Sequence, residues 1–310
     1  MSENHVFDII IIGGGPAGYT AALYAARSGL DAIVLERLSA GGQMALTHEI
    51  DNYPGFEDTI DGFSLGDKMK RQAERFGAKT KTAEVVEVNF QSNPKVIKTA
   101  SETLYSKAVI LSTGANPREL GIENERELTG RGVSYCAACD GMFYRNKTVV
   151  VVGGGNSAAA DALLLSRVAK KVYIVHRRNS LKATKIYHEP LMNAQNVEFV
   201  WDSVVSEFIF DNKISGVRVK NTKTSSDRVI DCDGVFISIG RSPATDFLRG
   251  HVKLDSNGYI VAGEDTKTNV RGVFAAGDLR TKPFRQIVTA VADGAVAVEA
   301  VQEFLAEGEV

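Results

Sequence analysis

Two of the three cysteines lie three positions apart in the stretch SYCAACDG, as Cys136 and Cys139. A pair with this spacing can bind a metal, form a structural crosslink, or alternate between dithiol and disulfide in a redox reaction. A zinc site would need two further ligands, and the sequence contains no second Cys-x-x-Cys and no paired histidines, so we predict no metal site. Because thiolates are reactive and neighbouring thiols exchange with disulfides, we favour a redox centre.

An acid, Asp140, follows the second cysteine directly. Dithiol exchange releases a thiolate that must take up a proton, and an acid within reach can supply it. Asp-Gly is also a common turn pair, but we favour the catalytic role. The third cysteine, Cys232, lies in RVIDCDGVFISIG, which predicts a buried position on a strand.

Composition limits the possible partners. The chain has 310 residues, 44% of them hydrophobic and 24% charged, with a net charge of -2. This balance is typical of a globular protein and offers no basic field for nucleic acid or an anionic membrane. No apolar run approaches the roughly 20 residues of a membrane-spanning helix, and the first residues are acidic where a signal peptide is basic. We therefore expect a cytoplasmic protein with small-molecule or protein partners.

The chain contains the same strand–helix–strand pattern twice. Residues 7–37 and 147–177, a shift of 140 (147 minus 7), both read as a β-branched run, a triple glycine, an Ala- and Leu-rich helical stretch and a second apolar run. In each copy the glycines allow a tight turn, close approach to a pyrophosphate and a helix N-terminus facing its charge. Two matched copies predict two dinucleotide sites. Their residues are Gly13, Gly15, Pro16, Ala17 and Gly18 in the first copy, and Gly153, Gly155, Asn156 and Ser157 in the second.

The two copies differ at the end of their second strand. Glu36, followed by Arg37, suits the ribose hydroxyls of FAD or NAD. The equivalent position in the second copy is His176, in a basic run that could be a solvated loop but whose place in the fold favours the 2'-phosphate of NADPH. The basic residues of this second site are His176, Arg177, Arg178 and Lys182.

A second, weaker repeat indicates the domain boundaries. Residues 108–117 and 235–243 are both apolar strands that end in glycine, with a proline three residues later. Each is preceded by short alternating strands, and a long amphipathic helix is predicted over 285–308. We therefore predict an α/β fold of two Rossmann-like, three-layer ββα dinucleotide-binding domains, the second inserted into the first. The FAD-binding domain comprises residues 1–117 and 245–310, and the NADPH-binding domain with the cysteine pair comprises 118–244.

Together the motifs GGGPAG, GGQ, DNYPGF, TGA, CAACDG, GGGNSA, HRR and AAGD, in this order and spacing, resemble the bacterial-type, low-molecular-weight NADPH-dependent thioredoxin reductases. The resemblance runs from about residue 6 to about residue 305. It implies a homodimer in which electrons pass from NADPH to FAD, then to the Cys136–Cys139 disulfide, and finally to thioredoxin. It also implies that the two domains swivel between two poses during turnover.

The resemblance assigns further roles. It makes Cys139 the thiol that faces the flavin, Cys136 the one that attacks thioredoxin, and Asp140 the acid and base. The last helix would direct its N-terminal dipole at the reduced flavin ring. The remaining cofactor-binding residues implied are Gly42, Gln43, Asn52, Thr113, Gly114, Ile239, Gly277, Asp278, Arg285, Gln286 and Ile287.

This sequence departs from the family pattern at two places. Lys182 stands where the family usually has arginine, and lysine lacks the bidentate fork of arginine, so a weaker preference for NADPH is expected. Met142 and Phe143 stand where the family often has two aromatic residues that help to dock thioredoxin. Three alternatives stay open: a reductase for another thioredoxin-like carrier or a peroxidase, a reductase fed by ferredoxin or reduced flavin, and a redox sensor without turnover.

Overall fold

The computed structural model describes residues 5–47 and 49–308, so part of the acidic N-terminus lies outside the described residues. The chain divides into two compact units, which are described in turn. The first comprises Met1–Asn116 with Ser242–Val310, and the second comprises Pro117–Arg241. Within the described residues, no helix is both long and apolar enough to cross a membrane.

The first unit is built on a seven-stranded sheet in the order β3-β2-β1-β6-β5-β4, with β17 also paired to β6. Strands β1, β2, β3, β6 and β17 are parallel to their neighbours among these five, whereas β4 and β5 continue the sheet as an antiparallel hairpin. The elements of this unit are β1 (Val6–Ile12), α1 (Pro16–Arg27), β2 (Ala32–Glu36), the 3-10 helix η1 (Gly42–Leu46), α2 (Gly62–Arg75), β3 (Lys79–Thr82), β4 (Val85–Asn89), β5 (Lys95–Thr99), β6 (Thr103–Leu111), the 3-10 helix η4 (Asp246–Leu248), β17 (Val273–Ala275) and α6 (Ile287–Glu307).

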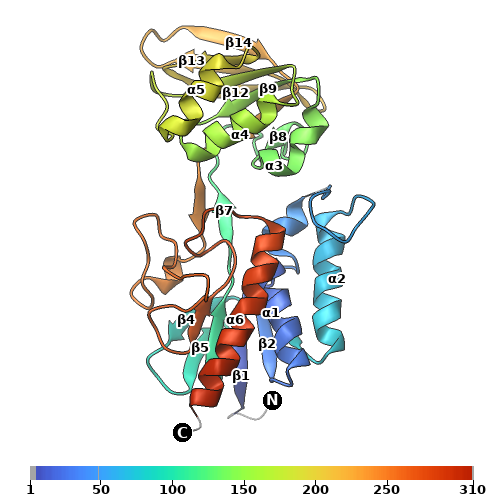
Figure 1. Ribbon diagram of the computed structural model, residues 1–310, viewed down its shortest axis with the longest axis vertical. Coiled ribbons are helices and arrows are strands. Elements are labelled where there is room, and N and C mark those ends of the chain that lie inside the picture. The colour runs from blue at the N-terminus through green and yellow to red at the C-terminus, as the bar shows by residue number, and fades with distance from the viewer. Residues whose placement is uncertain (1–4, 48, 309–310) are drawn as a thin grey trace. The chain divides into compact units, whose positions relative to one another are not determined.

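Strand β1 shows why this unit has two core layers. Successive side chains of a strand point to opposite faces, and its apolar run is buried on both. Ile9 and Ile11 pack with the alanines of α1 and α6, whereas Ile10 and Ile12 pack with residues of β4 and the C-terminal loops. Figure 1 shows α1, α2 and α6 together on the helical side of the sheet.

The second unit repeats this plan. Its parallel sheet has the order β11-β10-β9-β15-β8, and a separate antiparallel sheet has the order β12-β13-β14. Val149 and Val151 of β9 pack with the alanines of α4, whereas Val150 and Val152 pack with the antiparallel strands. The elements are β8 (Val133–Ser134), α3 (Ala137–Asp140), η2 (Gly141–Tyr144), β9 (Thr148–Val152), α4 (Asn156–Ser166), β10 (Lys171–Val175), η3 (Lys185–Tyr187), α5 (His188–Asn193), β11 (Val197–Val200), β12 (Ser203–Phe210), β13 (Ile214–Asn221), β14 (Asp227–Asp231) and β15 (Gly234–Ile237).

The predicted α/β fold with two three-layer halves is confirmed. Helices α1 and α4 begin at Pro16 and Asn156, which are 140 residues apart (156 minus 16) as the internal repeat predicts. Two short strands, β7 (Ala115–Pro117) and β16 (Arg241–Pro243), lie where the chain leaves the first unit and returns to it.

Two local predictions need correction. Cys232 is buried as expected, but it lies in the connection between β14 and β15 rather than on a strand. Its N–H still donates to the carbonyl of Ser215 in β13 at 3.1 Å, and the chain bends at the next residue, Asp233. The last helix begins at Ile287 with Gln286 as its N-cap, so Arg285 precedes the helix. Gln286 and Thr289 bond each other's backbone in a capping box, which fixes the start of the helix at Ile287.

Candidate active site

Cys136 and Cys139 form a disulfide, with their Cα atoms 5.3 Å apart. Cys136 is the N-cap of α3, and its carbonyl accepts hydrogen bonds from the N–H groups of Cys139 and Asp140. This single helical turn brings the two sulfur atoms together. Both cysteines are half-buried, so a protein disulfide could approach them.

A hydroxyl links the cysteine pair to the neighbouring acid. Ser134, the last residue of β8, donates a hydrogen bond from Oγ to Oδ2 of Asp140 at 2.6 Å. Oγ of Ser134 also accepts the N–H of Cys136 at 3.1 Å. After α3, Met142 is 57% exposed and Phe143 is 39% exposed, so an apolar surface adjoins the disulfide.

The first glycine turn follows β1. Gly13 has φ +108°, and a Cβ at Gly18 would overlap the carbonyl oxygen of Gly13, so the close crossing of β1 and α1 requires glycine. Glu36 crosses this turn: its carboxylate accepts the N–H of Gly14 at 2.6 Å and that of Leu38 at 3.1 Å. The carboxylate predicted for a ribose is therefore held beside the glycines.

The second glycine turn follows β9. Gly153 has φ +144°, and the carbonyl of Gly154 accepts the N–H groups of Lys182 and Ala183 at 2.7 and 3.1 Å. Oδ1 of Asn156 accepts the N–H of Thr184 at 2.8 Å. The segment that carries Lys182 is thus tied to the turn, and Arg177, Arg178, Lys182 and Ser157 are all exposed.

His176 does not contribute the positive charge that the sequence suggested. Its ring is buried against Gly154, where any Cβ would collide with it. Burial and the charges of Arg178, Arg177 and Lys182 lower the pKa of His176 below its ordinary value. The imidazole is neutral at neutral pH, and the positive charge of this site comes from the arginines and Lys182.

In the first unit, several predicted residues converge beside the glycine turn. The turn at Gly277, with φ +90°, packs against the side chain of Ala17. Asn52 donates to Oε1 of Gln286 at 3.1 Å, and Arg285 donates to the carbonyl of Asp278 at 3.2 Å. The motif DNYPGF, the motif AAGD and the start of α6 therefore lie close together in the first unit.

Asp293 of α6 is a buried acid beside these residues that the sequence analysis did not predict. Its buried carboxylate accepts the N–H of Gly277 at 2.7 Å, two bonds from Arg280 and one from Lys282 at 2.9 Å. Although burial alone would raise the pKa of Asp293, the bonds from Arg280 and Lys282 hold it below its usual value. An acid within an otherwise apolar helical stretch was the signal that could have identified it.

The other predicted residues take varied positions. Gly42 and Gly114 adopt positive φ, and Ile239 is exposed after β15. Gln43 donates to Oδ1 of Asn116 at 2.8 Å, and Thr113 donates to the carbonyl of Ala244 at 2.7 Å. Arg37 pairs with Glu84 at 3.6 Å on the surface.

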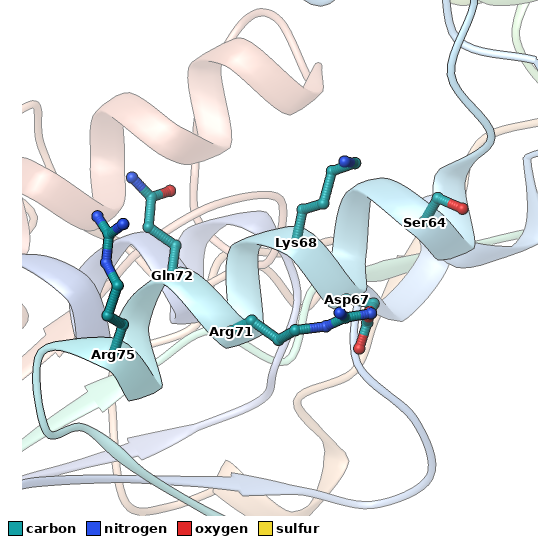
Figure 2. A pocket seen from close by; sticks show the side chains of 6 residues that line it. All are labelled: Ser64, Asp67, Lys68, Arg71, Gln72 and Arg75. Carbon is teal, nitrogen blue, oxygen red and sulfur yellow. The ribbon is translucent and has the colours of Figure 1, made fainter.

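One hollow contains none of the predicted site residues. It has a volume of about 570 Å³ and is lined by side chains of α2 alone, as Figure 2 shows. Arg71 folds back onto Asp67, while Lys68, Gln72 and Arg75 extend outward. No group of three or more potential metal ligands occurs among the described residues.

The profile of the pyridine nucleotide-disulphide oxidoreductase family matches residues 7–294. A thioredoxin reductase from Listeria monocytogenes is 45% identical over 99% of this chain and 96% of its own length, and one from Bacillus subtilis is 43% identical over 99% and 97%. The chain belongs to the pyridine nucleotide-disulphide oxidoreductase family. The crystal structure of the thioredoxin reductase from Streptococcus pyogenes, 42% identical, superimposes with a TM-score of 0.92 over 98% of this chain and 99% of that one.

The glycine turns fit the two cofactors of the family. Among the described residues, no side chain caps α1 at Gly15 or α4 at Gly155, so backbone N–H groups at both helix starts can bind phosphate. A Cβ at Gly155 would meet nothing within 4 Å, and one at Gly15 would meet only a carbonyl at 4.0 Å. The protein is an oxidoreductase with FAD and NADPH as its cofactors.

Proposed function

We propose that this protein reduces thioredoxin with electrons from NADPH. The observation that carries the proposal is the half-buried Cys136–Cys139 disulfide, joined through Ser134 to Asp140 and adjoined by exposed Met142. This arrangement combines an exchangeable disulfide, an acid within reach and an apolar surface for a protein partner.

FAD would bind in the first unit. The turn at Gly13, Gly15 and Gly18 and the start of α1 would hold its pyrophosphate, and Glu36 its ribose. Asp278 and the N-terminus of α6 would face the ring system, where the helix dipole favours the negative charge of the reduced flavin. The further residues of this site are Pro16, Ala17, Arg37, Gly42, Gln43, Asn52, Thr113, Gly114, Gly277, Arg285, Gln286 and Ile287.

NADPH would bind in the second unit. The turn at Gly153 and Gly155 would hold its pyrophosphate, while Arg177 and Arg178 would pair with its 2'-phosphate. Neutral His176 would support the glycine turn by packing against Gly154, and Ile239 would contact the nicotinamide half. Asn156, Ser157 and Lys182 complete this site.

When bound, NADPH supplies a hydride and FAD passes the two electrons to the disulfide. The thiolate of Cys136 then attacks one sulfur of the thioredoxin disulfide, so a bond forms between the two proteins while the thioredoxin bond breaks. Asp140 gives a proton to the departing thiolate. The thiolate of Cys139 next attacks Cys136, re-forms the internal disulfide and releases the second thioredoxin thiolate.

The partner would dock against Met142 and Phe143, because these exposed apolar side chains adjoin the disulfide. We further propose that the protein is a homodimer, as the family resemblance implies. A reducing compartment such as the cytoplasm suits a catalytic Cys-x-x-Cys pair.

Steady-state oxidation of NADPH, and separately of NADH, with and without a bacterial thioredoxin plus an artificial disulfide acceptor tests the proposal. Thioredoxin-dependent turnover that prefers NADPH is expected. Bleaching of the flavin without thioredoxin turnover would move the search to another carrier. No flavin reduction by either nucleotide would instead indicate ferredoxin or reduced flavin as the donor.

A further inference from the structure

The hydroxyl of Ser134 occupies a specific place beside the disulfide. Ser134 is 3% exposed, and its strand β8 pairs with β15 through the register of Ser134 with Phe236. The side chain therefore comes from the sheet rather than from a loose loop. Its Oγ lies 2.6 Å from Oδ2 of Asp140, 3.1 Å from the backbone nitrogen of Cys136 and 3.5 Å from the carbonyl oxygen of Cys136.

The direction of these bonds follows from chemistry. A hydroxyl has one hydrogen to donate, and the two available acceptors are the carboxylate of Asp140 and the carbonyl of Cys136. The oxygen of Asp140 is nearer, at 2.6 Å against 3.5 Å for the carbonyl, so it receives the hydrogen. A lone pair of the Ser134 oxygen accepts the N–H of Cys136. The hydroxyl of Ser134 therefore accepts a hydrogen bond from the backbone of Cys136 and donates one to Asp140.

We propose that Ser134 is a positioning residue that holds the carboxylate of Asp140 at the cysteine pair. The disulfide closes the turn from Cys136 to Cys139 covalently, but that closure is lost each time the pair is reduced. The two hydrogen bonds of Ser134 do not depend on the sulfur–sulfur bond, so they tie Asp140 to Cys136 in the dithiol as well. This inference rests on the proposed function of Asp140 as the proton donor.

Three variants test the proposal. In stopped-flow measurements on the prereduced, FAD-loaded enzyme, Ser134→Ala is expected to slow reduction of a thioredoxin disulfide about tenfold, the loss of one hydrogen bond to a charged group. Flavin reduction by NADPH should stay within about twofold of the unaltered protein. Ser134→Thr keeps the hydroxyl and should recover most of the rate. Ser203→Ala removes another buried hydroxyl of the second unit, 4% exposed and bonded to the carbonyl of Trp201, and serves as the matched control.

A double-mutant cycle with Asp140→Asn decides whether Ser134 acts through the acid. The double variant should be no slower than Asp140→Asn alone. Three outcomes would each overturn the proposal. The rate losses of the two single variants could multiply in the double variant, Ser134→Ala could be as fast as the unaltered protein, or Ser134→Thr could be as slow as Ser134→Ala.

Alkylation separates this test from that of the proposed function. In a Cys139→Ser background reduced with dithiothreitol, the rate at which iodoacetamide modifies Cys136 is measured for the same cycle. The positioning role is supported if Ser134→Ala, Asp140→Asn and the double variant all change this alkylation rate by the same factor. This holds even if no thioredoxin turnover is found. Thioredoxin turnover without any such coupling, in either readout, would leave the proposed function intact and refute the role of Ser134.

Discussion

At the scale of single residues, burial separates the three cysteines into two kinds. Cys136 and Cys139 are half-buried and joined, whereas Cys232 is 5% exposed and burial raises the pKa of its thiol to about 12. A thiol with so high a pKa carries almost no thiolate at neutral pH and is chemically inert. Only the central pair can take part in exchange.

Serine substitutions at the pair should separate the two halves of the reaction. Cys136→Ser and Cys139→Ser are each expected to keep FAD and its reduction by NADPH, while thioredoxin reduction falls to background because no disulfide can form. Absorbance of the flavin and steady-state NADPH oxidation measure the two steps. Cys232→Ala is the control and should turn over normally; wild-type turnover by either serine variant would contradict the assignment.

At the scale of elements, α6 holds the proposed flavin site together through two consecutive residues. Asp293 bonds the N–H of Gly277, and Gly294 lets α6 approach α1 so closely that a Cβ would overlap the carbonyl oxygen of Ala17. One helix thereby positions both the AAGD turn and the glycine turn. The contact between α1 and α6 depends on the absence of a single side chain.

Gly294→Ala should separate α1 from α6. The overpacked contact is expected to destabilise the protein by about 1–3 kcal/mol and to weaken retention of FAD. Urea unfolding and the FAD content after gel filtration measure these effects. Gly308→Ala, in the same segment with only ordinary contacts at 3.6 Å, is the control; equal loss in both variants would show that the contact with Ala17 is unimportant.

Asp293 should make stability depend on acidity. Its folded pKa lies below the value of about 3.9 expected in the unfolded chain, so its stabilisation is complete above that pH and is lost as the pH falls through the folded pKa. Asp293→Asn leaves Arg280 and Lys282 without their buried counter-charge and should destabilise the protein by about 3 kcal/mol at pH 7. Urea midpoints at pH 7, 5, 4 and 3 should converge for the two proteins toward the acid end. Parallel midpoints across this range would count against the role of Asp293.

At the scale of the whole molecule, the chain uses one plan twice. In each unit a central strand with parallel neighbours, β1 or β9, leads into a glycine turn, and each unit has its own two core layers. A nucleotide bound to one turn therefore stabilises mainly the unit that contains it.

Hydrogen exchange should reveal this division. NADP⁺ added at about 100 times its dissociation constant to the FAD-loaded protein stabilises the binding unit by about 2.7 kcal/mol. Peptides that cover residues 153–158 and 176–182 should exchange more slowly, while peptides that cover 13–18 should be unchanged. Protection of the first glycine turn instead would reverse the assignment of the two cofactors.

The sequence by itself determined much of this protein because its signals are local. The repeat at a shift of 140 predicts both strand–turn–helix units, since glycine at a turn and alternating apolar residues act through their immediate neighbours. The same holds for the cysteine pair, whose spacing within one helical turn is sufficient for a disulfide. The family resemblance added the cofactors and the partner.

Only the tertiary structure decided what depends on burial and on contacts between distant residues. His176 belongs to a basic run, yet its ring is buried against Gly154 and its pKa is lowered, because desolvation and the neighbouring charges disfavour the imidazolium. Asp293 is the first of four acids in α6, and it gains its partners only when folding brings Arg280 and Gly277 to it. A sequence shows which groups can be charged or bonded, whereas the environment that selects among those states exists only once the chain is folded.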